Sequence, residues 1–225
     1  MTKYSAEYEL ANYGPVEAAL YLRLPVYDVR RWINEGVIAA PKGGISFLNL
    51  LELHILKGLR RQFRLPFQRI RRALEEYVKT EPFHRPLLDP RLETDGIHLF
   101  IHDGDEYLNL NRSRQLGIPQ ILSTYLQRID RLDNHEFRFF PFVVAEEPEE
   151  PRTIQMSPRV AFGRPVLANT GITTEVIAGR FRARDSISDL AEEYGVPIPM
   201  IEDAVRWELP QLSAMRPELS HVNAA

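Results

Sequence analysis

The sequence predicts an α+β fold that is mainly helical, with a helical region on each side of a short β-containing middle. Three observations predict it. Residues 15–80 show the three-to-four-residue apolar spacing of amphipathic helices, and residues 175–207 return to it. Between them, residues 89–142 contain alternating apolar and polar runs around an Asp-Gly turn signal. A chain of 225 residues is long enough for two or three small domains that each bury a core.

The first region is predicted to contain two consecutive helices joined by a tight turn. Pro15 suits the first turn of a helix, and Val16 to Leu22 follow without a breaker. After Pro25, a second apolar-periodic run extends from Tyr27 to Ile33 and ends just before Gly36.

A small hairpin and two longer helices are predicted next. Residues 37–47 hold Pro41 and Gly43-Gly44 between short apolar patches, which indicates a hairpin. Leu48 to Phe63 and Pro66 to Tyr77 then have helical periodicity.

The middle and the last third are predicted from turn residues and periodicity. Hairpin strands flank Asp103-Gly104-Asp105, and the acidic, proline-rich run 146–151 indicates a linker. We expect a helix over Pro119–Ile129 and a strand over Phe137–Val144, then three helices over Glu175–Phe181, Ile187–Tyr194 and Met200–Trp207, and a frayed tail from Pro210.

Composition and charge exclude several classes of protein. There is no cysteine, which excludes disulfides, thiolate metal sites and a cysteine nucleophile. No stretch approaches the roughly 20 apolar residues that cross a bilayer, and the first residues lack the apolar core of a secretory signal. We therefore expect a cytoplasmic protein with no membrane partner.

The net charge of −3 conceals a basic segment. From Arg23 to Arg85 there are thirteen Lys or Arg against six Asp or Glu, a net +7, so the rest of the chain carries −10. A basic segment joined to an acidic remainder is typical of a phosphate-contacting module attached to a regulatory body.

Two helix-turn-helix units are predicted, one near each end. Such a unit needs a small residue where its helices cross, a permissive residue in the turn and apolar residues facing inward. Gly195 permits the left-handed turn of the second helix-turn-helix. Arg23 stands at the corresponding position of the first, so glycine does not explain the turn there. Otherwise the spacing recurs 172 residues apart: Ala18, Ala19, Leu22, Leu24, Val29 and Trp32 match Leu190, Ala191, Tyr194, Val196, Ile201 and Ala204.

The first helix-turn-helix has the surface chemistry for DNA. Arg can read guanine and Asn can read adenine in the major groove. The predicted outward residues of its second helix are Tyr27, Asp28, Arg30, Arg31 and Asn34. Lys42 at the hairpin tip would act as a wing. Further on, the arginines that could contact the DNA backbone are Arg60, Arg61, Arg64, Arg69, Arg71 and Arg72.

The second helix-turn-helix is poorer in positive charge. Its candidate recognition helix carries Glu202, Asp203 and Glu208, which phosphates would repel. We therefore expect the second helix-turn-helix to contact protein.

Two parts of the sequence resemble known families. Val16–Leu22, Val29–Ile33 and Ser46–His54 resemble MerR-like winged helix-turn-helix domains, specifically those of large VapB-type antitoxins. Ser157–Val166 with Thr170–Ile172, followed by Ser186–Gly195, is similar to a small antitoxin domain that is paired with PIN-type ribonuclease toxins.

The resemblance implies a homodimeric antitoxin that blocks a PIN-type toxin and represses its own operon by binding operator DNA. It implies no enzyme activity and no cofactor, and it places the toxin contact within residues 157–225. The expected organisation is a MerR-like winged helix-turn-helix domain (1–88), a middle α/β domain that dimerises or braces (89–145), a linker (146–156), a helix-turn-helix antitoxin domain (157–209) and a tail (210–225).

Two alternatives remain open. A ligand-responsive transcription regulator would use the middle strands to bind a small molecule. A metal-dependent enzyme would need ligands such as His98 and His102, but residues four apart on a strand lie about 13 Å from each other, too far to share one ion. We expect no metal site, and we expect His54 at the edge of a core. No nucleophile motif and no phosphate-binding glycine loop occurs.

Overall fold

The protein is α+β and mainly helical, as its sequence predicts, and the described part of the chain contains two small two-stranded sheets. The computed structural model describes residues 4–61, 66–80, 85–88, 123–132 and 136–214. It divides into two compact units, Tyr4–Asp130 and Arg131–Ala225, which we call the first unit and the second unit.

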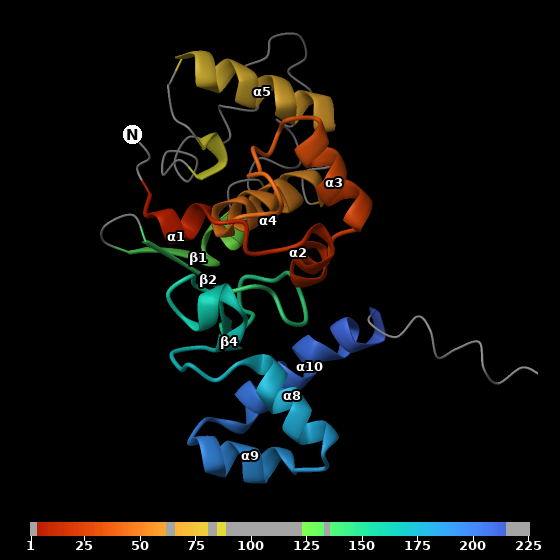
Figure 1. The fold of residues 1–225 in the computed structure, drawn as a ribbon, viewed down its shortest axis with the longest axis vertical. Coiled ribbons are helices and arrows are strands. Elements are labelled where there is room, and N and C mark those ends of the chain that lie inside the picture. Colours follow the sequence, from red (N-terminus) through yellow and green to blue (C-terminus); the bar gives the residue numbers. More distant parts are fainter. Residues whose placement is uncertain (1–3, 62–65, 81–84, 89–122, 133–135, 215–225) are drawn as a thin grey trace, which may run out of the picture. The chain divides into compact units, whose positions relative to one another are not determined.

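The described part of the first unit is largely helical (Figure 1). Its elements are α1 (Ala6–Glu9), α2 (Pro15–Leu22), α3 (Val26–Asn34), α4 (Phe47–Arg61), α5 (Phe67–Thr80) and the short turn η1 (Pro86–Leu88). The four helices predicted between residues 15 and 80 are confirmed, with ends within a few residues of those expected.

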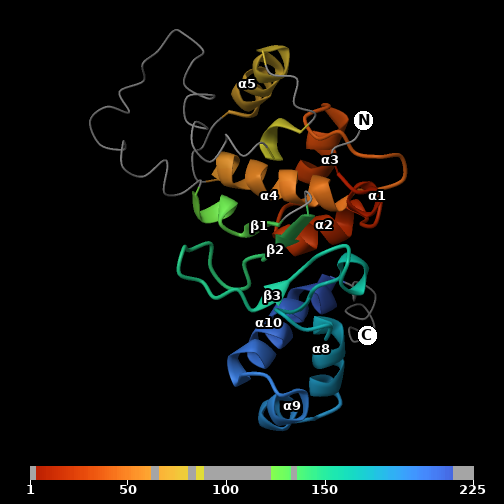
Figure 2. The same cartoon turned by 90° about the vertical axis from the view of Figure 1, so that its left-hand side faces the viewer.

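Helix α4 forms the centre of the first unit. It contacts α1, α2 and η1, and it lies among them in both views (Figures 1 and 2). Its side chains are buried from Phe47 to Leu59, so no polar face is left for water. A helix that is buried all round belongs to the core of its domain.

Local signals at the helix starts explain where α2 and α4 begin. At α4, the Ser46 hydroxyl accepts the Asn49 N–H at 3.2 Å, while the Asn49 side-chain oxygen accepts the Ser46 N–H at 3.1 Å. At α2, Pro15 occupies the first turn and the Glu17 carboxylate accepts the Gly14 N–H at 3.3 Å. The pair at α4 is reciprocal and the bond at α2 runs one way, and both satisfy N–H groups that the helix itself leaves without acceptors.

The hairpin expected within residues 37–47 is wrong. Ile45 pairs instead with Tyr13, and the two residues exchange backbone hydrogen bonds of 3.0 and 2.8 Å. Gly44 comes so close to this partner that an added Cβ would lie 2.9 Å from the Tyr13 carbonyl oxygen. The turn residues predict a reversal of the chain, but they do not say which segment the returning strand will meet.

In its described residues, the second unit combines short strands with three helices. It contains β2 (Glu136–Phe139), β3 (Ile154–Gln155), the short turn η3 (Ala161–Gly163), β4 (Val166–Leu167), α8 (Thr174–Arg182), α9 (Ile187–Tyr194) and α10 (Ile198–Ala214). Strands β3 and β4 are antiparallel, with Ile154 opposite Leu167, and α10 packs on α8, α9 and both strands. Strand β1 (Ile129–Leu132), within which the two units divide, pairs with β2.

Several predicted boundaries need correction. The helix expected over 119–129 is helical in its described part only at 123–126, because β1 begins at Ile129. The strand expected to reach Val144 ends at Phe139. Helix α10 continues through Pro210 to Ala214, so the tail does not fray at the proline. A proline removes its own N–H and its ring crowds the carbonyl four residues earlier, but the buried Trp207 and Glu208 hold the helix just before it.

The predicted hairpin around Asp103-Gly104-Asp105 lies outside the described residues. The acidic run that follows β2 is anchored: the Glu150 carboxylate accepts the backbone N–H groups of Val143, Val144 and Ala145 at 2.5, 2.8 and 3.1 Å. Among the described helices, none combines the length and the apolar character that a membrane crossing requires.

Candidate nucleic-acid interface

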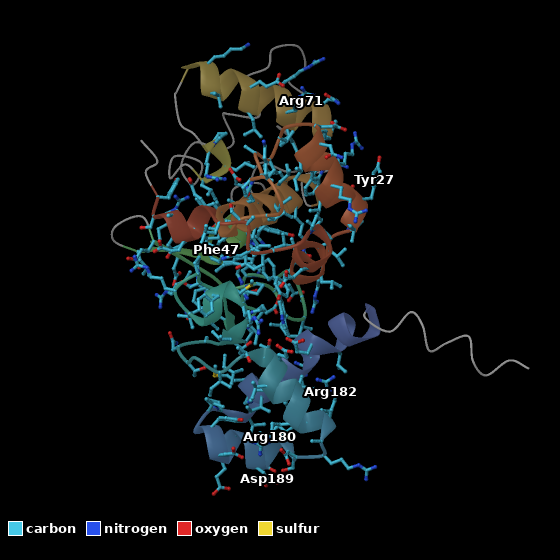
Figure 3. The ribbon with its side chains drawn as sticks, viewed as in Figure 1. Tyr27, Phe47, Arg71, Arg180, Arg182 and Asp189 are labelled. Atoms are coloured by element: carbon cyan, nitrogen blue, oxygen red, sulfur yellow. The ribbon has the colours of Figure 1, made fainter. Side chains whose placement is uncertain are left out.

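Helix α3 is amphipathic. Val29 and Trp32 face the core and are 0% and 2% exposed. Tyr27, Arg30 and Asn34 are exposed on the other side, at the three-to-four-residue spacing that places side chains on one helix face. Tyr27, at 70% exposure, projects away from the helices (Figure 3). The exposed face of α3 therefore carries an aromatic ring, a guanidinium and an amide.

Arg31 differs from Arg30 because it is already engaged. Its Nε donates to the Glu35 carboxylate at 2.7 Å, and its guanidinium lies over the Phe67 ring of α5, 5.2 Å from the ring centre. The hydrogen bond and the charge of Glu35 raise the pKa of Arg31 further above its usual value. Arg31 thus links the end of α3 to α5, a contact that the sequence does not reveal because Phe67 is 36 residues away.

The other predicted DNA contacts differ in how exposed they are. Asp28 is half-buried in the first turn of α3, where the positive end of the helix dipole stabilises a carboxylate. Lys42 is exposed in the turn before α4. Arg60 is half-buried near the end of α4. Arg61 ends that helix but its side chain is outside the described part, as is the whole of Arg64.

The turn between α2 and α3 is left-handed despite its arginine. Arg23 has φ 50° and ψ 47°, and the Leu24 N–H donates to the Ala19 carbonyl at 2.8 Å. This residue closes α2 in the way that glycine usually does. Leu24 then fills the turn at 8% exposure.

The turn between α9 and α10 has the same conformation. Gly195 has φ 63° and ψ 35°, and the Val196 N–H donates to the Ala191 carbonyl at 3.0 Å. We call α2–α3 the first helix pair and α9–α10 the second helix pair. Most of the twelve predicted inward positions are buried in both pairs, while Tyr194 and Val196 are half-buried.

The second helix pair presents acidic groups. Asp189 and Glu192 are exposed on α9, and Glu202 is exposed on α10 (Asp189 is labelled in Figure 3). Asp203 accepts the Thr153 hydroxyl at 2.8 Å and pairs with Arg206 at 2.5 Å. The exposed face of α10 therefore lacks the uncompensated positive charge that phosphates attract.

A guanidinium clamp joins α8 to α9. Arg180 makes two hydrogen bonds to the Glu193 carboxylate, at 2.9 and 2.8 Å, and it also pairs with Asp185. The Arg180 hydrogen bond lowers the pKa of Glu193, and the two acids raise the pKa of Arg180. Sequence reasoning missed this clamp because Arg180 and Glu193 are on different helices.

A buried polar chain runs along α4. Glu52 pairs with Arg85 at 2.8 Å and accepts the Asn49 amide at 2.9 Å, and the same amide group reaches the Ala39 carbonyl at 3.1 Å. Burial raises the pKa of Glu52, against the opposing pull of Arg85 and Asn49. These contacts hold residues 39 and 85 against α4, so the network is structural.

His54 lies inside the core rather than at its expected edge. It is 1% exposed, and its Nε2 lies 3.0 Å from the Tyr125 carbonyl oxygen. Burial, with help from the charge of Lys57, lowers its pKa to about 3, so the ring is neutral at physiological pH. In the part of the chain that the structure describes, no three His, Cys, Asp or Glu side chains gather as metal ligands. His98 and His102 lie outside that part.

Comparisons with known proteins agree with an antitoxin-like chain. Residues 154–207, from β3 into α10, match the family Protein of unknown function (DUF433). The chain is 24% identical over 230 residues to a Mycobacterium tuberculosis protein named "Putative antitoxin VapB45", covering 88% of this chain and 94% of that one.

A solved structure has the same fold. The crystal structure of Rv2018 from Mycobacterium tuberculosis matches with a TM-score of 0.69 and 23% identity, over 88% of this chain and 99% of that chain. The protein thus shares the fold of Rv2018 and is similar, over most of its length, to a protein named as an antitoxin.

Proposed function

We propose that this protein is a non-catalytic, cytoplasmic antitoxin that neutralises a PIN-type ribonuclease toxin and represses its own operon. The observation that carries the proposal is the similarity to the VapB45 relative, which extends over 88% of this chain and 94% of that protein rather than over one motif. A match of this extent includes both the helical first part and the last third of the chain, and the relative's name supplies the proposed antitoxin role.

The first helix pair is the proposed DNA-binding element, a helix-turn-helix of the MerR-like winged type. Helix α3 would enter the major groove, with Arg30 and Asn34 at base edges and Tyr27 beside them. The backbone contacts would come from Lys42, Arg60, Arg61 and Arg64. This assignment is supported by the exposed face of α3 and by the net charge of +7 between Arg23 and Arg85.

Within that surface, Arg31 has a supporting role. Its ion pair with Glu35 and its position over Phe67 orient the end of α3, and Asp28 stabilises the start of the same helix. A homodimer would present two copies of α3 about 34 Å apart, one turn of DNA, as a palindromic operator requires.

The second unit is the proposed toxin-binding part, within residues 157–225. Its sequence from residue 131 onward carries ten Lys or Arg against fifteen Asp or Glu. That balance disfavours DNA and suits a protein partner.

Co-expression tests the proposal directly. The small reading frame beside this gene is expressed alone and then together with this protein, and growth is followed. Arrest that co-expression relieves is the expected result. A gel shift with the DNA upstream of the gene tests repression separately. Growth arrest without rescue, or no arrest, would leave at most a DNA-binding protein and would favour the ligand-responsive regulator.

A further inference from the structure

The loop that joins β3 to β4 contains three consecutive residues in the left-handed backbone region. Ala161, Phe162 and Gly163 have φ values of 46°, 55° and 85°. Only glycine adopts such values without strain, and an L-residue there costs about 1–2 kcal/mol. Two of the three residues are therefore strained, and strain of this kind persists only where the surrounding structure imposes it.

The loop is held at its base. Inside it, the N–H groups of Val160, Gly163 and Arg164 donate to carbonyls three residues earlier, at 2.9, 3.0 and 3.1 Å. At its ends, Ile154 is paired with Leu167 across β3 and β4. The loop thus presents its tip in one conformation.

That tip is an exposed phenyl ring. Phe162 is 87% exposed, whereas Phe139 and Phe140 of the same unit are 0% and 5% exposed. An exposed phenylalanine adds nothing to the stability of its own unit, and here it also occupies a strained position. An exposed ring on a strained backbone indicates that the ring is presented to a partner, because burying an aromatic side chain contributes much of the free energy of binding.

Charge identifies the kind of partner. Arg159 and Arg164 flank the ring and are half or more exposed, so an occupant with carboxylates around an apolar pocket would suit them. Each arginine already has a carboxylate nearby, Glu136 for Arg159 and Glu175 for Arg164. The net charge of −5 over residues 131–225 disfavours the polyanionic backbone of a nucleic acid and favours a protein as the partner.

We infer that Phe162 is the anchor by which this protein holds its toxin, entering an apolar pocket whose rim carries carboxylates for Arg159 and Arg164. The inference rests on the proposed antitoxin function and assigns the toxin contact to one loop. The complex buries the ring, and the two arginines turn from their own acids to those of the partner.

The test uses the full-length protein and the toxin from the growth assay, with affinity measured by calorimetry. Phe162→Ala and Phe162→Gly should each weaken binding by about 30-fold or more, as truncation of a central aromatic anchor does. Phe162→Gly should also leave the melting temperature unchanged or higher, because glycine relieves the strained φ. If Phe162 only supported the fold, its replacement by glycine would lower the melting temperature. Phe181→Ala is the matched control: this ring is 40% exposed on α8, and its loss should change affinity less than about threefold.

Four results would overturn the inference. Wild-type protein that gives no rescue removes the proposed function, and the anchor with it. Rescue by wild type, with the Phe162 variants binding toxin within threefold, removes the anchor alone. Loss of operator DNA binding in these variants would assign the loop to nucleic acid. A lower mass by light scattering would assign it to a second copy of this chain.

Discussion

The two helix pairs have the same turn and opposite surfaces. Arg23 and Gly195 close their first helices in one conformation, and Leu24 and Val196 follow in the same place. On the outer face the charges reverse: at the same spacing of 172 residues, Arg30 corresponds to Glu202 and Arg31 to Asp203. The buried positions thus maintain one backbone arrangement, while the exposed positions are free to adapt each pair to a different partner.

The turn residues differ in what they contribute. Gly195 adopts a positive φ at no steric cost, and nothing lies within 4 Å of the place where its Cβ would be. Arg23 adopts nearly the same φ with a full side chain. Packing of Ala19, Val29 and Trp32 holds the first turn in place, so tertiary contacts there override a local preference.

The largest expected effect comes from exchanging the surface charges. Arg30→Glu gives the first helix pair the charge of the second and should weaken operator binding about 100-fold, because it removes a base contact and adds repulsion from phosphates. Binding is measured by fluorescence anisotropy at one fixed salt concentration. Glu202→Arg is the matched variant and should change affinity less than threefold. A clear gain from Glu202→Arg would show that the second helix pair also lies on DNA.

Two helical glycines, one in each unit, should respond in opposite directions. A Cβ on Gly58 of α4 would lie 2.7 Å from the Tyr125 ring, whereas a Cβ on Gly179 of α8 would meet only the end of Arg182, 3.9 Å away. Gly58→Ala should therefore destabilise the first unit by about 1–3 kcal/mol through overpacking. Gly179→Ala should stabilise the second unit by about 0.5–1 kcal/mol, because alanine favours a helix.

Fluorescence can follow each unit separately. The chain has two tryptophans, Trp32 in the first unit and Trp207 in the second, and both are buried. Urea unfolding of Trp→Phe single-tryptophan backgrounds then reports one unit at a time. A Gly58→Ala variant as stable as wild type would mean that Tyr125 moves aside at little cost.

The first unit should also lose stability in mild acid because of His54. Its folded pKa of about 3 lies below the ordinary value of 6.5, so its contribution is present above pH 6.5 and is lost as the pH falls toward 3. The unfolded chain then binds one more proton, at about 1.4 kcal/mol per pH unit. His54→Gln cannot take up this proton, so its unfolding free energy should fall less steeply between pH 6 and 4. Parallel pH profiles for the two proteins would contradict the assignment.

The smallest effects should come from the turns. Gly195→Ala places a Cβ at φ 63° and should destabilise the second unit by about 1 kcal/mol. Arg23→Gly relieves the corresponding strain and should stabilise the first unit by a similar amount. Thermal unfolding of each single-tryptophan background measures both. Equal stability of Arg23→Gly and wild type would mean that the arginine side chain compensates for its own strained backbone.

Much of the fold could be predicted because its signals are local. The ends of α9 were predicted at Ile187 and Tyr194, where a serine cap and a glycine stand on either side. The inward positions of the first helix pair could also be predicted, since helical periodicity determines which residues share a face. The hairpin predicted after α3 is wrong, and the actual pairing of Ile45 with Tyr13 could not be predicted because the two residues are 32 positions apart.

The sequence by itself determined the helices, the spacing of the two helix pairs and the division between a basic and an acidic part. Each depends on residues a few positions apart or on composition, and such patterns act before the chain has folded. Only the tertiary structure decided that Arg31 lies over Phe67 and that Glu52 pairs with Arg85. It also decided that Phe162 stands exposed on a strained loop. Such features join segments far apart in the chain or result from how both ends of a loop are held, and no local pattern encodes which distant partner a side chain will meet.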